Sequence, residues 1–133
     1  MATWEDVRRL AQFLPETVES DNPRSAGGTM VWRVRDKSFA WERPLGRGDL
    51  DALGDAAPTG PILAVRVADE GVKQFLVHSN PGVYFTTPHF SGYPAVLVRL
   101  DRIAVLELEE ILGEAWLSRA PRRLAKDWLE GRA

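Results

Sequence analysis

The feature that most restricts the fold is a pair of strand-like runs, TMVWRVR and SFAWER, separated only by Asp36 and Lys37. Each run mixes large apolar residues with charged ones, as a strand with one buried face does. A connection of two residues forms a tight turn between antiparallel neighbours. We therefore predict a β-hairpin over residues 29–43, and the Asp-Lys pair leaves the type of turn open.

A turn centred on residues 36–37 fixes the register of this hairpin. The resulting pairs are Val34 with Phe39, Trp32 with Trp41, Arg33 with Ala40 and Arg35 with Ser38. The large apolar side chains then share one face and the charged side chains share the other. A half-buried hairpin requires such a division between its faces.

The N-terminal segment is predicted to be an amphipathic helix. Thr3 and Asp6 nearly match a capping box, and Pro15 ends the segment. The apolar residues between them recur at helical spacing: Val7, Leu10, Ala11 and Leu14. A short strand follows at 17–20, and residues 21–28 have the composition of a loop.

The middle of the chain alternates loops and apolar strands. Residues 44–60 read as an irregular loop with one helical turn, and residues 61–67 and 83–87 read as strands. Residues 95–100 read as a central strand that is covered on both faces. The segment 70–78 fits either a strand after a turn or a helix capped by Asp69, and the pattern slightly favours the strand. In the helical alternative Val72, Phe75 and Leu76 share a face.

The C-terminal third is predicted to form two helices, because its apolar residues form two stripes. The stripes are Leu108, Ile111, Leu112, Ala115 and Trp116, and then Leu124 and Trp128, with Pro121 at the start of the second helix. Strands followed by helices indicate the α+β class. We expect residues 1–133 to form a single domain, a mainly antiparallel sheet with helices packed on one face.

Composition removes several classes of function. The chain has no cysteine, which excludes disulfides and thiolate ligands. It contains neither of the glycine-rich nucleotide motifs, and its two histidines, eleven residues apart, do not have a metal-binding spacing. We therefore predict no catalytic residues, no metal ligands and no cofactor. The N-terminus lacks an apolar leader, and no long apolar run exists, so we expect a cytoplasmic protein without membrane contact.

The net charge of −2 conceals segments of opposite sign. Residues 33–47 and residues 119–132 each carry five positive and two negative side chains. Residues 101–114 carry five acidic side chains and one basic side chain, and residues 49–55 carry three aspartates. Such segments are either solvated faces of mixed sign or local contact surfaces.

The arginines are the strongest candidates for ligand contact. Arg33 and Arg35 lie on the polar face of the hairpin, and Arg66 and Arg99 each interrupt an apolar strand. A charge at such a position must reach water or a partner. If the helices cover one face of the sheet, the open face becomes a basic platform suited to phosphate. The alternative is local ion pairing, for example of Arg33 with Glu42.

Two further side-chain types permit alternative interpretations. His89 either contacts a phosphate or ties backbone groups of the loop PHFSGYP, which prolines restrict on both sides. The tryptophans could stack on bases, but the apolar stripes favour core packing. The tryptophans assigned to the core are Trp32, Trp41, Trp116 and Trp128, whereas Trp4 stays open.

The stretch NPGVYFTTPHFSGYPAVLVRLDRI, together with ILGEAW and APRRLA, resembles the MmcQ/YjbR family. The WRVRDKSFAW hairpin and the N-terminal helix match in place, so the resemblance covers nearly the whole chain. It implies a frataxin-like (CyaY-like) arrangement, in which residues 70–78 are a helix. The family is described as DNA-binding through a double-wing arrangement, and the resemblance implies no catalytic residue.

Three functional hypotheses follow. The first is weak DNA binding, with phosphate contacts from the following basic residues: Arg33, Arg35, Lys37, Arg66, Arg99 and, as a neighbour, His89. The second is a protein-interaction module that uses the basic tail or the acidic helix with Glu107, Glu109, Glu110 and Glu114. The third, by analogy with frataxin alone, is metal handling by Glu5, Asp6, Glu16, Glu19 and Asp21.

Overall fold

The computed structural model describes residues 1–21 and 29–131, so most of the predicted loop at 21–28 lies outside the described residues. The elements are α1 (Trp4–Gln12), β1 (Thr17–Asp21), β2 (Met30–Val34), β3 (Lys37–Glu42), α2 (Arg47–Leu53), β4 (Ile62–Arg66), α3 (Glu70–Ser79), β5 (Tyr84–Phe85), β6 (Ala95–Arg99), α4 (Val105–Arg119) and α5 (Arg122–Gly131). Short 3₁₀ turns occupy Gly54–Ala56 and Pro88–Phe90.

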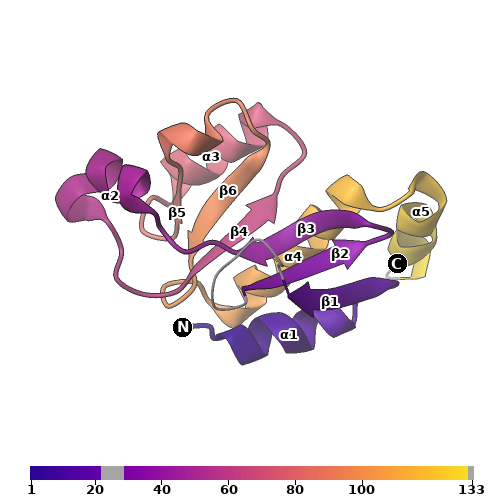
Figure 1. Ribbon diagram of the computed structural model, residues 1–133. Coiled ribbons are helices and arrows are strands. Elements are labelled where there is room, and N and C mark those ends of the chain that lie inside the picture. Colours follow the sequence, from indigo (N-terminus) through magenta and orange to yellow (C-terminus); the bar gives the residue numbers. More distant parts are fainter. Residues whose placement is uncertain (22–28, 132–133) are drawn as a thin grey trace.

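The strands form one six-stranded antiparallel sheet in the order β1-β2-β3-β4-β6-β5. Helices α1 and α4 cover one face of this sheet, and α2 lies at the left of the molecule in Figure 1, in contact with the 3₁₀ turn Pro88–Phe90. The predicted α+β class with an antiparallel sheet is confirmed. Within the described residues, no helix is both long enough and apolar enough to span a membrane.

The predicted hairpin exists, but the predicted register is wrong. The turn is formed by Arg35 and Asp36, whose φ angles of 47° and 69° are those of a mirror-image turn, so Val34 pairs with Lys37. The register then shifts by one residue, and Trp32 pairs with Ala40 rather than with Trp41. Such a bulge places one extra residue on one strand. Trp41 therefore lies on the opposite face from Trp32, where it packs against a second apolar cluster.

The sheet has an apolar core on each face. The larger core lies under α1 and α4 and contains Trp32, Phe39 and Trp116, which are all almost fully buried. The smaller core lies on the other face and contains Phe85, Phe90 and several residues of β4 and β6. Alternate residues of β6 enter the two cores, which confirms that this strand is covered on both faces.

The tryptophans pack as apolar residues do. Trp4 stacks on Trp32 with 6.4 Å between ring centroids, and Trp128 of α5 lies 5.1 Å from Trp116 of α4. The second contact depends on Gly113, because a Cβ there would lie 3.3 Å from the Trp128 ring. Core packing is thus confirmed, including Trp41 against the smaller core.

Helix α1 begins as predicted, with a reciprocal capping box between Thr3 and Asp6. The segment 47–53 forms a helix longer than the single turn expected there. The segment at 70–79 is helical, as the family resemblance implies, and Asp69 caps it by accepting a hydrogen bond from the Val72 amide. The strand favoured by its pattern is therefore wrong.

The buried face of α3 also differs from the predicted stripe. Phe75 is 69% exposed, whereas Lys73 is only 1% exposed and points inward with Leu76 and Val77.

Candidate nucleic-acid interface

Three of the predicted site residues, Arg33 on β2, Arg66 on β4 and Arg99 on β6, lie on one face of the sheet. The residues on either side of each arginine belong to the larger core: Trp32, Val34, Val65, Val67, Val98 and Leu100. Because successive side chains of a strand point to opposite faces, the three arginines point away from α1 and α4. All three are half-buried.

Each of these arginines contacts neutral groups. Arg33 donates to the Ser20 hydroxyl at 3.0 Å. The guanidinium of Arg66 lies 5.0 Å from the Tyr93 ring centroid and donates to the Tyr93 hydroxyl at 2.9 Å. These contacts hold the side chains in place but leave their positive charges without a counter-charge.

Arg99 is held in a similar way at the other end of the sheet. Its guanidinium lies 4.5 Å from the Phe85 ring centroid and donates to the Pro81 carbonyl at 2.8 Å. Burial and the nearby Arg102 lower the pKa of Arg99, and Asp101 partly offsets them. A guanidinium stays charged at neutral pH despite such a shift.

No described carboxylate forms an ion pair with the three sheet arginines. The predicted alternative, a pair between Arg33 and Glu42, is not formed. Glu42 instead accepts a hydrogen bond from the Met30 amide. Among the arginines with carboxylate partners are Arg8, Arg9, Arg35 and Arg43.

The arginines share a face but form two groups along it. Arg66 lies opposite Ala95, and Arg99 lies opposite Ile62, four residues away along β4, so their backbones are about 13 Å apart. The strand registers place Arg33 near the Arg66 end, two strands away, at roughly 10 Å. The arginines therefore do not form one continuous platform: Arg33 and Arg66 lie at one end of the face, and Arg99 lies at the other.

The structure adds Arg119, which the sequence analysis does not single out. It ends α4, and its pKa is lowered by burial and then by the charge of Arg66. The Nε atoms of Arg66 and Arg119 are buried without a hydrogen-bond partner among the described residues. Only the packing of α4 against β4 brings these two residues together, and no local sequence pattern signals it.

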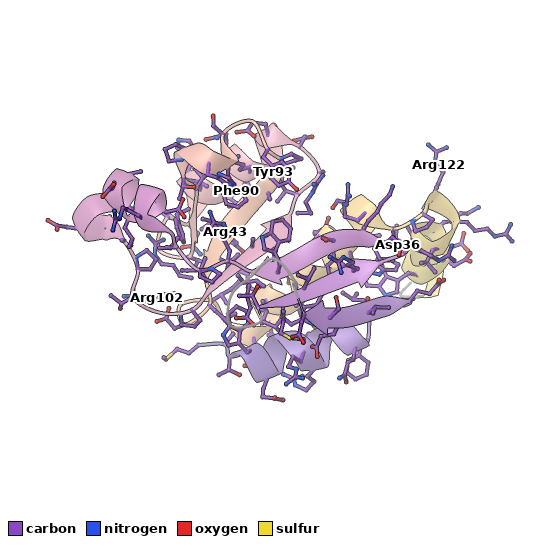
Figure 2. All side chains as sticks on the ribbon, viewed as in Figure 1. Asp36, Arg43, Phe90, Tyr93, Arg102 and Arg122 are labelled. Atoms are coloured by element: carbon purple, nitrogen blue, oxygen red, sulfur yellow. The ribbon has the colours of Figure 1, made fainter. Side chains whose placement is uncertain are left out.

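The other three predicted residues lie outside this group. Arg35 and Lys37 are exposed at the hairpin tip, whose end Asp36 marks in Figure 2. Arg35 forms a bidentate ion pair with Glu16 that includes a bond of 2.8 Å to Oε2, and it lowers the pKa of Glu16. Arg35 thus has a counter-charge that the sheet arginines lack.

His89 is exposed in the 3₁₀ turn Pro88–Phe90, where its ring meets the Phe90 ring edge-on at 5.4 Å. The interpretation that His89 ties the loop backbone is wrong. The buried Lys73 performs that role, because its Nζ donates to the Phe90 carbonyl at 2.5 Å and to the Tyr93 carbonyl at 2.9 Å. Glu70 lies 3.3 Å from the same Nζ. A lysine on the apolar stripe of α3 is the sequence signal that could have indicated this contact.

Lys73 thereby holds the backbone of Phe90 and Tyr93, two residues whose rings contact arginines. Phe90 lies 5.4 Å from the guanidinium of Arg43, and Tyr93 contacts Arg66. Figure 2 shows Phe90 and Tyr93 close together in the loop beside α3, with Arg43 nearby. Arg43 itself is paired with the buried Asp49 at 3.0 Å.

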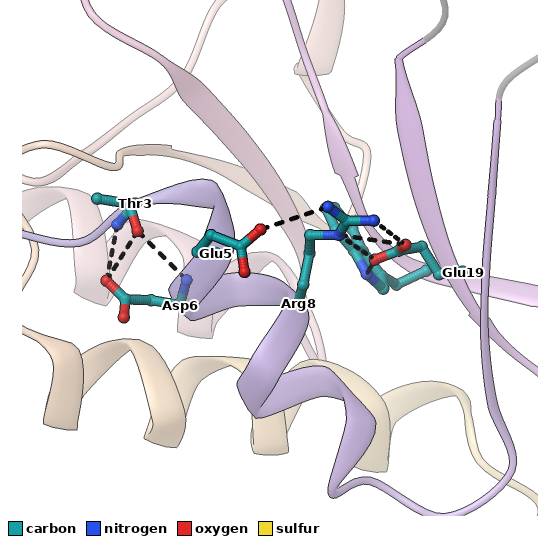
Figure 3. A network of polar contacts seen from close by, with 6 residues as sticks. Thr3, Glu5, Asp6, Arg8 and Glu19 are labelled. Carbon is teal, nitrogen blue, oxygen red and sulfur yellow. Dashed lines mark hydrogen bonds and ion pairs between the residues drawn. The ribbon is translucent and has the colours of Figure 1, made fainter.

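Four of the five carboxylates of the metal hypothesis form ion pairs with basic side chains, and Figure 3 shows two of them, Glu5 and Glu19, at Arg8. Arg8 bridges Glu5 and Glu19, and Arg9 pairs with Asp6. Glu19 also accepts a hydrogen bond from the Trp32 indole at 2.9 Å. The part of the chain that the structure describes contains no group of three or more potential metal ligands.

The fold and the arginine face define a small α+β protein built on an antiparallel sheet. A family model described as YjbR matches residues 13–118, and the chain belongs to this family. Uncharacterized proteins of Mycobacterium bovis and Mycobacterium tuberculosis are 53% identical over 132 residues, which cover 97% of this chain and 97% of each relative.

A solved structure shares the fold. It is the crystal structure of a Deinococcus radiodurans protein that carries the family-model domain DUF419. The two structures have a TM-score of 0.63 and 24% sequence identity, and the match covers 88% of this chain and 78% of the other.

Proposed function

We propose that this protein is a non-enzymatic nucleic-acid-binding protein that binds DNA weakly through phosphate contacts from the sheet face. The observation that carries the proposal is the placement of Arg33, Arg66 and Arg99 on one face without a described carboxylate partner. A guanidinium carries five N–H donors, so contacts with one hydroxyl or one carbonyl leave donors for phosphate oxygens.

The separation of these residues also supports the proposal. Spacings of about 10 and 13 Å along a sheet match contacts with several phosphates rather than with one small anion. Each neutralised phosphate releases counterions, and this term dominates non-specific binding. The net charge of −2 opposes long-range attraction, so we propose weak binding that depends on these local contacts.

The neighbouring side chains support a binding role rather than a reaction. The buried Asp49 is paired with Arg43, and its ionised form is further favoured by the Gly46 amide. His89, the imidazole in the loop, forms no hydrogen bond or ion pair with the described residues, and its ring meets that of Phe90. A DNA ligand implies a cytoplasmic location, with which the absence of cysteine agrees.

The test is a titration of a labelled 20-base-pair duplex with the protein at about 50 and 200 mM salt, followed by fluorescence anisotropy. The first variant combines Arg33→Ala, Arg66→Ala and Arg99→Ala. The control combines Arg9→Ala, Arg122→Ala and Arg123→Ala, which removes the same charge from exposed helical positions. Circular dichroism checks that both variants are folded.

We expect the sheet variant to lose at least tenfold in affinity at low salt, and its salt dependence to fall by roughly three counterions. The control variant keeps its affinity and its salt dependence within about twofold of the parent, because it removes no proposed phosphate contact and so releases the same number of counterions. The proposal is wrong if the parent does not bind at 50 mM salt, or if the two variants lose affinity equally.

A further inference from the structure

A second surface lies between α3 and α4, on the side of the sheet that carries the larger core. It is a groove of about 510 Å³. Leu76 of α3, Tyr84 of β5 and Ile111 of α4 line its interior, and all three belong to the larger core or pack against it. The sheet arginines point to the opposite face, so this groove is separate from the proposed DNA contact.

The two helices that flank this groove carry apolar side chains that are exposed to water. Leu106, at the start of α4, lines the groove and is 76% exposed. On the neighbouring α3, Phe75 and Val72 are also exposed large hydrophobic residues. Contiguous exposed apolar side chains flanked by charges mark interaction sites more often than isolated ones do.

A row of carboxylates runs along the α4 side of the same groove. Glu107, Glu110 and Glu114 are spaced three and four residues apart, so they share one face of the helix. Glu110 and Glu114 are exposed, and none of the three forms an ion pair with a described basic residue. Glu107 accepts a hydrogen bond from the Tyr84 hydroxyl at 2.5 Å, which fixes it at the groove.

We propose that the groove between α3 and α4 binds a basic amphipathic helix of a partner protein. The apolar face of such a helix would lie on Leu76, Leu106 and Ile111, and its lysines or arginines would meet the carboxylate row. This is the helix-in-groove mode, in which anchors recur every three or four residues. Charge complementarity selects a basic partner, because carboxylates repel nucleic acid and anionic lipid.

A second copy of this chain fits the groove less well. In a symmetric pair, each copy presents the same patch to the other. The carboxylate rows of the two α4 helices would then face each other at short range, which destabilises the pair. The argument is independent of DNA binding, since it uses none of the sheet arginines.

The test uses two synthetic 18-residue peptides of the same Lys-Leu composition. In one peptide the leucines recur at helical spacing, and in the other the order is scrambled. Binding to the full chain is measured by fluorescence anisotropy at about 150 mM salt, where exposed charges alone are screened. The groove variant is Glu110→Lys with Glu114→Lys, and Leu106→Ser tests the apolar contact. The control, Asp51→Lys with Asp55→Lys, makes the same charge change at exposed residues outside the groove.

We expect the amphipathic peptide to bind the parent and the control variant with similar affinity. Its affinity for the groove variant should be at least tenfold lower, and its affinity for Leu106→Ser should be several-fold lower. The proposal is overturned if the scrambled peptide binds equally well or if the groove and control variants behave alike. It is also overturned if sedimentation shows a dimer of the parent that Leu106→Ser disrupts, because the occupant is then a second copy.

Discussion

Two kinds of basic side chain in this protein differ in the acceptors that they contact. Arg8, Arg35 and Lys73 contact carboxylates of the protein itself, and Lys73 also contacts two backbone carbonyls. Arg33 and Arg66 contact hydroxyls and an aromatic ring. The first kind has its charge compensated within the fold, whereas the second kind keeps a positive charge at the surface of the sheet.

This comparison shows how a chain of net charge −2 can carry a locally basic face. The total charge says little, because many of the bases are already matched by acids elsewhere. A count of basic residues would rank Arg35 equal to Arg66, yet Arg66 lacks the described carboxylate partner that Arg35 has. Local pairing, rather than the number of bases, identifies the candidate site.

The largest expected effect comes from removing the best-compensated charge, with Lys73→Met. The change removes two charge-assisted hydrogen bonds to the carbonyls of Phe90 and Tyr93, each of which keeps one backbone amide donor. The loss costs about 3 kcal/mol in the free energy of unfolding. Urea denaturation measures this loss. The matched control is Lys126→Met, which removes an exposed ion pair at 3.9 Å and leaves the unfolding midpoint nearly unchanged. Equal effects of the two changes would contradict the role of Lys73.

A smaller effect is expected for a single arginine of the second kind. Arg66→Ala removes one phosphate contact, so DNA affinity falls several-fold and the salt dependence falls by about one counterion. Arg66→Lys keeps the charge and restores most of the salt dependence, although it loses the contact with the Tyr93 ring. An Arg66→Lys variant that binds as poorly as Arg66→Ala would indicate a structural role for Arg66 instead. Anisotropy titrations at several salt concentrations distinguish these outcomes.

The next effect concerns the stability contributed by Glu19, the carboxylate partner of Arg8. Arg8 and the Trp32 indole lower the pKa of Glu19 below its ordinary value of 4.5, against a smaller opposing effect of burial. The stability from Glu19 is therefore fully present above pH 4.5 and is lost as the pH falls through its folded-state pKa. Glu19→Gln lowers the free energy of unfolding at pH 7 by about 1 kcal/mol.

The same variant changes the pH dependence of stability in a defined direction. Between neutral pH and acid, Glu19→Gln loses less stability than the parent, because the variant no longer has this carboxylate to protonate. Urea midpoints measured at pH 7 and near pH 3 give the comparison. Parallel losses in the parent and the variant would show that Glu19 is not preferentially ionised in the folded state.

The smallest expected effect comes from removing the carboxylate partner of Arg35, which makes it an arginine without a counter-charge, like Arg33 and Arg66. Glu16→Gln releases Arg35 from its ion pair at the hairpin tip, so Arg35 gains donors for a phosphate. DNA affinity at low salt then rises by less than about threefold, because exposed pairs are weak. Glu5→Gln, which removes a longer contact of 3.4 Å with Arg8, serves as the control. A rise of equal size in both variants would mean that only net charge matters.

Local patterns predicted much of the fold, but not the register of the hairpin. Patterns within a single element predicted the N-terminal cap, the apolar stripe of α4 and the burial of β6. The position of the turn could not be predicted in this way. Arg35 and Asp36 both have positive φ angles, and a sequence signals such angles mainly through glycine or asparagine. The bulge next to Trp32 depends on packing between strands, and it moved Trp41 to the other face.

The sequence predicted which residues belong to the candidate site, but not their contacts or their positions in space. A charge inside an apolar strand identified Arg66 and Arg99, because burial forces such a side chain to find a partner or water. The pairing of Arg35 with Glu16 and the interaction of Arg119 with Arg66 each join segments far apart in sequence. Tertiary contacts of this kind leave no periodic signal in the chain.

The strand order has a consequence for how the molecule behaves at high concentration. The sheet ends at β5, which has only two residues, and at β1, which carries Glu19 and Asp21 among its five. An open edge invites strands of other molecules to add to it, and short or charged edge strands discourage this. The sheet can thus keep its arginine face open to solvent while both of its borders resist edge-to-edge aggregation.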